Sequence, residues 1–363
     1  MDNLEKAILC TLHSINGIGN KRLWKIKDTF GSFLAFFEAD TSRMHACLPA
    51  ECVEKVIKNR SLNPLVNLEK LKAEGIKIVT IEDNDYPKSL RTIYDPPYVL
   101  YYQGSLEAVD STCIAVVGSR KATPYGIDQA ERLGQDLAQQ RITVVSGMAR
   151  GIDTAAHRGA LKGKGLTLAV LGSGINVIYP KENTKIYHEI IDSGAVISEF
   201  PYNTNPEPGN FPIRNRIISG LSQGVVVVEA KKKSGALITA DFALEQGRDV
   251  FAIPGPVSSP NSEGTNNLIK QGARLISGIE DILEEYSEIV PRLEPGKSRE
   301  KELQFLDNEE KLIIQCMSYE PVHFDELIKN TGLEIGVLST LLFKIEFKGI
   351  VKSLPGNYYV KIK

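Results

Sequence analysis

This chain of 363 residues has few cysteines, a single tryptophan and almost no net charge. Its formal net charge is -2 at pH 7, so binding of a polyanion would have to come from local clusters of lysine and arginine. No two of its five cysteines form a CxxC pair, and their odd number argues against a disulfide framework. We therefore expect reduced thiols and no metal site. The cysteines are Cys10, Cys47, Cys52, Cys113 and Cys316.

Long apolar runs and the common nucleotide-binding motifs are also missing. No apolar run approaches the ~20 residues of a membrane span, and MDNLEKAILC has no basic segment of a signal peptide. The sequence therefore predicts a cytoplasmic protein without a membrane span. No Gly-x-Gly-x-x-Gly fingerprint follows a predicted strand, and GxxxxGK[ST] is absent. We expect neither a dinucleotide site nor a P-loop, and no cofactor.

Three regions separate by pattern, the first being residues 1–70. Apolar residues at helical spacing predict a small helical domain there. Its segment INGIGNKRL places a Gly-x-Gly turn before Lys21 and Arg22, which resembles a helix-hairpin-helix (SAM-like) element. The turn amides and the next helix of such an element can touch a DNA backbone. The alternative, that the glycines only make the turn, stays open.

The second region, residues 71–285, alternates predicted strands with helices. Strands that are apolar throughout and alternate with helices indicate a mostly parallel sheet buried on both faces. The fold class is therefore α/β, with an extended Rossmann-like domain. The predicted strands are 76–81, 98–103, 113–118, 142–147, 166–172, 195–200, 224–230 and 249–255.

The last two regions are a linker and a small C-terminal domain. Residues 286–304 are charged, contain two prolines and a glycine, and predict a linker. Residues 305–363 predict three helices and a β-hairpin turning at Pro355 and Gly356, the layout of a winged-helix domain. Acidic residues outnumber lysines there, and the third predicted helix has no arginine. This composition favours a role in protein contact or packing over binding of the third helix in a DNA major groove.

The segment IAVVGSRKATPYG predicts a strand, a glycine turn and a helix. After the turn, Ser119 offers a hydroxyl and Arg120 a rigid fork of donors that suits phosphate. At the carboxyl end of a strand in an open α/β sheet, such residues are where a ligand binds. The alternative is an arginine that only forms a local salt bridge.

Two further segments bring basic residues to predicted strand ends or helix starts. FPIRNR opens a helix with Arg214, Asn215 and Arg216, and Phe211 precedes it. This combination suits single strands because a base stacks while phosphates pair. Phe211 could instead be a buried residue that fixes the start of the helix. EAKKKSG runs from a strand end to a helix start and offers Lys231, Ser234 and Gly235.

Two other segments are ambiguous. In GSGINVIYPKEN, Lys181 could add a charge to the same site, or be a solvated surface lysine. In SGMARGIDTAAHRGAL, Asp153 and His157 lie four apart on a predicted helix, the spacing of an acid–base pair or of metal ligands. No third ligand or nucleophile is evident, so we interpret both as structural residues and predict no catalytic residue.

These segments together resemble the DNA processing protein A (DprA/Smf) family. The resemblance rests on VGSRKATPYG, SGMARGIDTAAHRGAL, GSGINVIYPKEN, FPIRNRIISGLS and VVVVEAKKKSGALITADFALEQGRDVFAIPG, and it is dense from about residue 76 to residue 285. It implies a protein that binds and protects incoming single-stranded DNA during natural transformation and loads the RecA recombinase. A homodimer through the Rossmann-like domain is implied, and single-strand binding protein is a further candidate partner.

The resemblance implies a DNA pocket made of four segments. Its residues would be Ser119, Arg120, Lys181, Phe211, Arg214, Asn215, Arg216, Lys231, Ser234 and Gly235. The competing hypothesis is a nucleotide phosphoribohydrolase-like enzyme on the same core. Such enzymes usually carry a PGGxGTxxE segment, whereas the corresponding stretch here reads KKSGALITADFALE.

Overall fold

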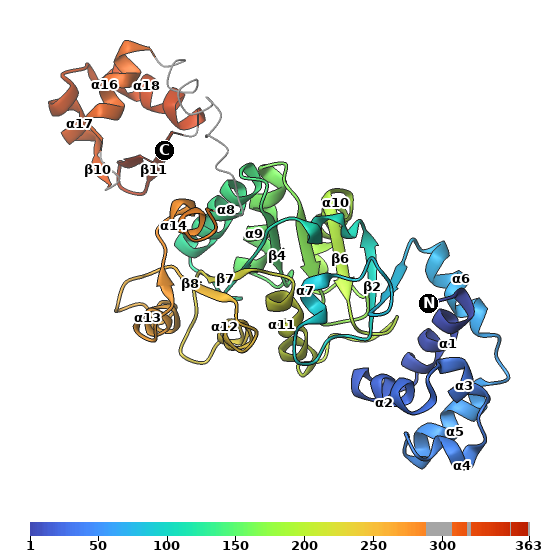
Figure 1. The fold of residues 1–363 in the computed structure, drawn as a ribbon. Coiled ribbons are helices and arrows are strands. Elements are labelled where there is room, and N and C mark those ends of the chain that lie inside the picture. Colours follow the sequence, from blue (N-terminus) through green and yellow to red (C-terminus); the bar gives the residue numbers. More distant parts are fainter. Residues whose placement is uncertain (288–306, 318–320, 349, 362–363) are drawn as a thin grey trace. The chain divides into compact units, whose positions relative to one another are not determined.

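The computed structural model describes residues 1–287, 307–317, 321–348 and 350–361 (Figure 1). The chain forms two compact units, Met1–Arg292 and Leu293–Lys363. The first unit contains both the N-terminal helices and the sheet, and the predicted division near residue 70 stays a prediction. Most of the predicted linker, residues 288–304, lies outside the described residues.

Residues 3–73 form six helices. Asp2 and Ser32 cap two of them, each accepting a hydrogen bond from a backbone N–H in the first turn. The apolar faces of these helices pack on Tyr98 and on the strand that follows it, which contains Val99 and Tyr101. The helices are α1 (Asn3–His13), α2 (Asn20–Phe30), α3 (Phe33–Glu38), α4 (Thr41–Met44), α5 (Ala50–Asn59) and α6 (Pro64–Ala73).

The central sheet has nine strands in the order β1-β2-β6-β5-β4-β3-β7-β8-β9. β1 and β2 pair antiparallel, as do β2 and β6, and the remaining neighbours are parallel. This confirms the predicted mostly parallel α/β sheet. Its strands are β1 (Lys77–Thr80), β2 (Val99–Gly104), β3 (Cys113–Val117), β4 (Thr143–Ser146), β5 (Thr167–Val170), β6 (Gly194–Ser198), β7 (Gly224–Val227), β8 (Asp249–Ala252) and β9 (Arg274–Leu275).

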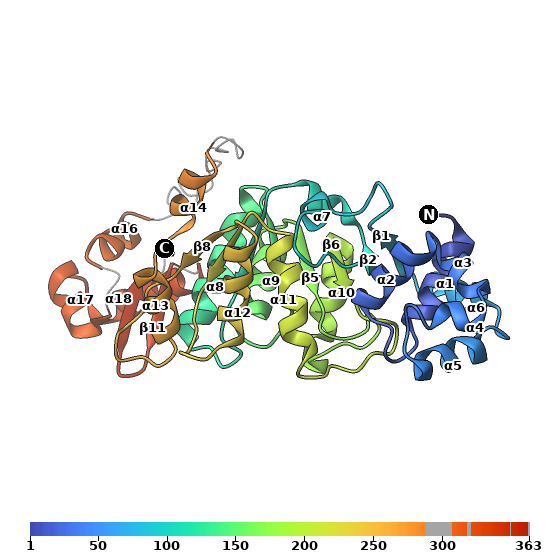
Figure 2. The same cartoon turned by 60° about the horizontal axis from the view of Figure 1, so that its bottom comes forward.

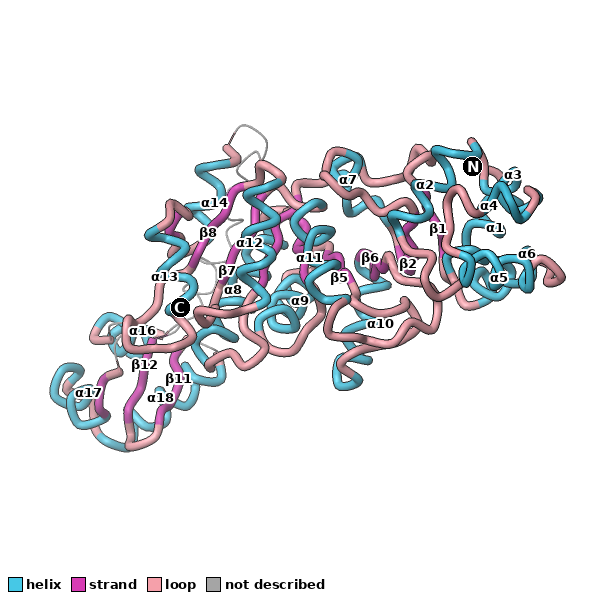
Figure 3. The backbone as a smooth tube through the Cα atoms, turned by 90° about the horizontal axis from the view of Figure 1, so that it is seen from below, coloured by secondary structure: helices cyan, strands magenta, loops and turns pink. Residues whose placement is uncertain are grey.

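Helices cover both faces of this sheet (Figure 1). One layer holds α8 (Pro124–Gln139), α9 (Ile152–Lys162), α10 (Thr184–Ser193) and α14 (Ile279–Glu285). The other holds α7 (Lys88–Arg91), α11 (Asn210–Gly220), α12 (Gly235–Glu245) and α13 (Glu263–Lys270). Figures 2 and 3 show α11 and α12 side by side in this second layer. The short 3₁₀ helices are η1 (Leu106–Asp110) and η2 (Lys181–Asn183).

The chain reverses its direction of winding at β3. From β3 it proceeds through β4, β5 and β6 to one side, and then returns to build β7, β8 and β9 on the other. In an open α/β sheet, the crevice outside the carboxyl ends of the strands at such a switch point is where ligands bind. From the fold we therefore expect a ligand site at the residues that follow β3 and β7.

The C-terminal unit has the winged-helix layout. Its helices are α16 (Asn308–Gln315), α17 (Phe324–Thr331) and α18 (Ile335–Phe347), and its strands are β10 (Val322–His323), β11 (Val351–Leu354) and β12 (Tyr358–Lys361). The strands pair in the order β10-β12-β11, and the predicted hairpin turn at Pro355 and Gly356 is confirmed. No helix among the described residues is long and apolar enough to cross a membrane.

His157 is fully buried in α9, and its ring has only one partner. The Thr167 hydroxyl donates to the Val144 carbonyl, so it accepts from Nδ1–H of His157 at 2.7 Å. The other ring nitrogen, Nε2, has no hydrogen-bond partner. Burial, together with the charge of Arg214, lowers the pKa of His157 from 6.5 to about 3.

We therefore predict that acid destabilises the first unit through His157. Below pH 6.5 the unfolded chain binds a proton at this residue and the folded chain does not, so stability falls as the pH drops towards 3. Between pH 7 and pH 5 this histidine should cost about 2 kcal/mol. Between these two pH values, the free energy of unfolding of His157→Gln in urea should fall by about 2 kcal/mol less than that of the parent. His188→Gln, at an exposed site, should behave like the parent. An equal pH dependence in all three proteins would contradict the assignment.

Candidate nucleic-acid interface

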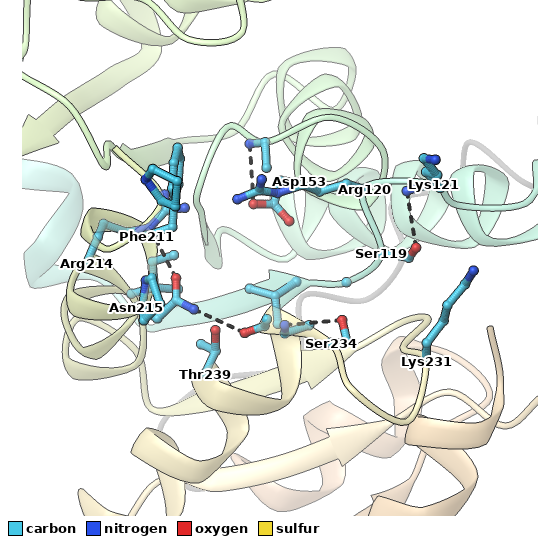
Figure 4. A pocket seen from close by; sticks show the side chains of 18 of the residues that line it. Ser119, Arg120, Lys121, Asp153, Phe211, Arg214, Asn215, Lys231, Ser234 and Thr239 are labelled. Atoms are coloured by element: carbon cyan, nitrogen blue, oxygen red, sulfur yellow. Dashed lines mark hydrogen bonds between the residues drawn. The ribbon is translucent and has the colours of Figure 1, made fainter. Parts of the chain in front are cut away.

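A pocket of about 550 Å³ lies at the carboxyl ends of β3 and β7 (Figure 4). One wall is the turn after β3, a second is the start of α11, and a third is the loop from β7 into α12. Eight of the ten predicted site residues line it: Ser119, Arg120, Phe211, Arg214, Asn215, Lys231, Ser234 and Gly235. The structure thus joins three segments that are far apart in the sequence into one site.

The aromatic ring of Phe211 lies among cations. The guanidinium carbon of Arg120 lies 4.6 Å from the centroid of this half-buried ring, and that of Arg214 lies 5.9 Å away. The Tyr179 ring lies 5.9 Å away in a tilted arrangement. Gly172 lies so close that a Cβ there would come within 2.9 Å of the Phe211 ring. Phe211 therefore packs on the backbone at Gly172, as a residue that also fixes the start of α11 should.

The guanidinium of Arg214 is buried and ties α11 to the sheet. Its Nη1 donates to the carbonyl of Gly147 at 2.7 Å and to the carbonyl of Val170, and its Nε donates to Oδ1 of Asn215 at 3.2 Å. Burial lowers the pKa of Arg214 to about 10, with the charge of Asp153 acting in the opposite direction. Arg214 therefore stays charged at neutral pH. It brings a fixed cation to the floor of the pocket.

Asp153 also lines the pocket and organises the loop after β4. Its Oδ2 accepts from the backbone N–H of Gly147 at 3.2 Å and of Ala149 at 3.4 Å. Burial raises the pKa of Asp153, whereas Arg214 and these two N–H groups act to lower it. His157 bonds instead to Thr167. The two residues thus have separate structural partners, which agrees with the structural interpretation of both.

The remaining predicted residues shape two backbone turns. The Ser119 hydroxyl accepts from the N–H of Lys121 at 3.2 Å, and the Ser234 hydroxyl accepts from the N–H of Ala236 at 3.4 Å at the start of α12. Gly235 is exposed, and no heavy atom lies within 4 Å of the position of a Cβ. Lys231 is exposed beside it. Ser234 therefore caps α12, while the exposed backbone of Gly235 and the nearby lysine remain open to an anion.

Two predicted residues lie outside this pocket. Lys181 is exposed in η2 and does not line it. Arg216 is only 5% exposed, and its guanidinium donates to Glu199 Oε2 at 2.6 Å and to Asp95 Oδ2 at 3.3 Å. It lies two positions after Arg214, and residues two apart on a helix do not face the same way. Grouping Arg216 with Arg214 in one pocket was therefore wrong.

Among the other residues that line the pocket, three bring an aromatic ring or a positive charge that the sequence motifs had not assigned to the site. Tyr179 contributes an aromatic ring, and Lys121 and Lys233 contribute charge. Both lysines adjoin selected residues, so membership of the same turns could have identified them. With these, the pocket gathers five basic side chains, Arg120, Lys121, Arg214, Lys231 and Lys233, and one acidic one, Asp153.

Comparison with known proteins assigns the family. The family model described as DNA recombination-mediator protein A matches residues 77–287, and that described as DprA winged helix domain matches residues 297–357. The chain belongs to the DNA recombination-mediator protein A family. Protein Smf of Synechocystis sp. is 36% identical in an alignment 396 positions long, which covers 99% of each chain. The resemblance found from the motifs is confirmed.

Two solved structures of the family resemble this one. DNA processing protein A (DprA) from Streptococcus pneumoniae has a TM-score of 0.65 at 35% identity, covering 78% of this chain and 98% of its own. DNA processing protein A from Helicobacter pylori, whose structure concerns a unique single-stranded DNA binding mode, has a TM-score of 0.53 at 31% identity. That match covers 58% of this chain and 96% of the other.

We predict that Gly147→Ala disables the pocket without removing any charged group. A Cβ at this position would lie 2.3 Å from Nη1 of Arg214, so the guanidinium has to leave its place on the sheet. Binding of an oligonucleotide should weaken at least about tenfold, a loss of about 1.4 kcal/mol. Gly209→Ala is the matched control, because nothing lies within 4 Å of a Cβ there. Equal affinity of the two variants, measured by fluorescence anisotropy, would contradict this role for Arg214.

Proposed function

We propose that the chain binds single-stranded DNA without sequence preference and keeps the strand intact for a recombinase. The observation that carries the proposal is the half-buried ring of Phe211 beside the guanidinium of Arg120, in a pocket that also holds four other basic side chains. A base can stack against the ring while phosphates pair with the cations. The relative from Helicobacter pylori, with its single-stranded DNA binding mode, supports this proposal.

The pocket favours a backbone-directed mode of binding. Arginine forks, lysines and the exposed backbone of Gly235 at the start of α12 recognise phosphate groups, which every nucleotide carries. Stacking on Phe211 is also open to every base, because each base has an aromatic face. Single strands offer splayed bases and duplexes do not, so the pocket should prefer single strands.

Within the same proposal, the chain passes its strand to RecA. Family membership supports a recombination mediator that loads RecA and acts on DNA entering during natural transformation, with single-strand binding protein as a further candidate partner. A homodimer through the sheet domain would place two pockets on one strand. Linking two sites raises the apparent affinity without any new contact.

The test of the pocket is a charge reversal at Arg120. We predict that Arg120→Glu weakens binding of a fluorescent dT oligonucleotide by about tenfold or more, because it removes a phosphate contact and adds repulsion. Phe211→Ala should cost about 1–3 kcal/mol if a base stacks on the ring. Lys58→Glu, an exposed reversal on α5, serves as the control with the same change in net charge. Arg120→Glu binding as tightly as Lys58→Glu would exclude this pocket as the DNA site.

The test of the mediator function measures RecA on a strand coated with single-strand binding protein. We predict that the chain shortens the lag before RecA filaments form, and that Arg120→Glu restores most of this lag. A lag that the parent chain leaves unchanged, although it binds the strand, would remove RecA loading from the proposal. Release of free base from nucleotides in the same preparation would instead favour the phosphoribohydrolase-like alternative.

A further inference from the structure

A second and larger hollow lies on the other side of α11. We call it the α2–α11 groove; its volume is about 1410 Å³. Its walls come from the end of α1 through the start of α2 (residues 13–24), the loop at residues 94–96, the loop at residues 199–207 and α11, with Phe242 of α12 beside them. The Gly-x-Gly turn and Arg216, both without a place in the candidate site, meet here.

Two of the segments that line the groove, the start of α2 and the loop before β2, are fixed to each other. The Asn20 amide donates to Asp95 Oδ1 at 2.9 Å and to the Pro96 carbonyl at 3.0 Å, and its oxygen accepts from the N–H of Tyr98 at 2.7 Å. The indole N–H of Trp24 also donates to the Pro96 carbonyl, at 3.1 Å. These bonds hold the start of α2 against this loop in the free chain.

The groove is lined by a buried ion pair with unused polar atoms. Arg216 and Glu199 are 5% and 7% exposed, and they share one hydrogen bond of 2.6 Å. Within residues 1–287, which the structure describes throughout, Nη1 of Arg216 and Oε1 of Glu199 have no hydrogen-bond partner. Buried polar groups are normally paired, and each unpaired one costs free energy. Both atoms are themselves covered in the free chain, so the ion pair shapes the wall of the groove and does not offer these atoms to a ligand.

The N-terminus of α2 adds an anion-binding element to the same groove. Gly19 caps this helix of 11 residues and provides no side-chain acceptor for its first N–H groups. Lys21 is exposed in the first turn and lines the groove. Free amides at a helix start, with a lysine beside them, suit one phosphate.

Aromatic side chains supply surfaces for bases. Tyr94 is fully exposed, and Phe200, Tyr202 and Phe242 line the same groove. The carboxylates of Glu199 and Asp95 are both bonded to Arg216, which reduces their repulsion of a polyanion. This mixture of aromatic rings, amides and one anion site fits a strand whose bases face the walls.

One stretch of chain, residues 205–213, separates the candidate site from the groove. Along residues 205–213 the side chains alternate between the two hollows. Pro206, Pro208, Phe211 and Pro212 line the candidate site, whereas Asn205, Glu207, Asn210 and Ile213 line the groove. A strand that leaves Phe211 and crosses the start of α11 therefore enters the groove.

We propose that the α2–α11 groove holds the part of a single DNA strand that continues from the candidate site. One phosphate binds at the start of α2 near Lys21, and the adjoining bases lie against Tyr94 and its neighbours. This inference rests on the proposed function. It adds a second contact region, which makes affinity rise with strand length beyond the pocket.

The chain carries its own reporter for this proposal, because Trp24 is its only tryptophan and lines the groove. The experiment titrates the full chain with dT oligonucleotides of about 4 to about 16 nucleotides, the site sizes common for single-strand-binding folds. Anisotropy of labelled DNA measures binding, and Trp24 emission measures occupancy of the groove. The shortest oligonucleotides that bind should leave the emission nearly unchanged, and longer ones should quench it.

Two variants complete the test. Tyr94→Ala should weaken binding of the longer oligonucleotides by roughly 5- to 150-fold, the effect of one lost stacked base, and leave the shortest unaffected. Lys21→Glu should reduce the quenching of Trp24, whereas Lys25→Glu, an exposed reversal on the same helix that does not line the groove, should not. Thermal unfolding of each variant confirms that it is folded.

The outcomes separate this inference from the proposed function. Long oligonucleotides that bind tightly without changing Trp24 emission, and with equal affinity for Lys21→Glu and Lys25→Glu, would overturn the groove and leave the pocket intact. Absence of binding at every length would overturn the proposed function itself. Quenching of Trp24 by an extended peptide but by no oligonucleotide would also overturn the inference.

Discussion

The buried guanidinium of Arg214 is the contact on which the candidate site depends. It joins α11 to the end of β5 through the Val170 carbonyl and to the loop after β4 through the Gly147 carbonyl. A buried cation is tolerated only where hydrogen bonds and an opposite charge compensate its desolvation, and here two carbonyls, Asn215 and Asp153 do so. Because α11 is held in this way, Phe211 is presented beside Arg120.

A nearly neutral chain obtains its anion site by local arrangement. The net charge of -2 gives no general attraction for a polyanion, and five basic side chains gathered at one switch point supply it locally. Helix α11 also has a second role, because its two arginines face different hollows. Arg214 belongs to the pocket, and Arg216 belongs to the ion pair that lines the α2–α11 groove. One helix thus organises both sides of the proposed strand path.

Much of the fold follows from the sequence pattern. Fully apolar strands such as β7 (Gly224–Val227) can be buried only between two helix layers, so the parallel sheet was predictable. Strands β9 and β10 have two residues each and give no periodic signal. The packing of α1–α6 on Tyr98 and Tyr101 was also beyond pattern reasoning, because it depends on contacts between distant segments.

The candidate site was predictable in part for similar reasons. Ser119, Arg120 and Lys231 follow strands that the switch-point rule places side by side. Arg216 was misplaced although helical geometry already separates it from Arg214 by two positions. The roles of Gly147 and Gly172 could not be predicted, because each depends on a side chain, Arg214 or Phe211, that approaches from another part of the chain.

The most direct test of the account compares single-stranded and duplex oligonucleotides of one sequence in equilibrium titrations at several salt concentrations. We expect the full chain to bind the single strand more tightly, with log affinity falling against log salt by about 0.7 for each neutralised phosphate. The strand should be recovered intact afterwards. Equal affinity for both forms, or an affinity for the single strand that does not change with salt, would contradict the account.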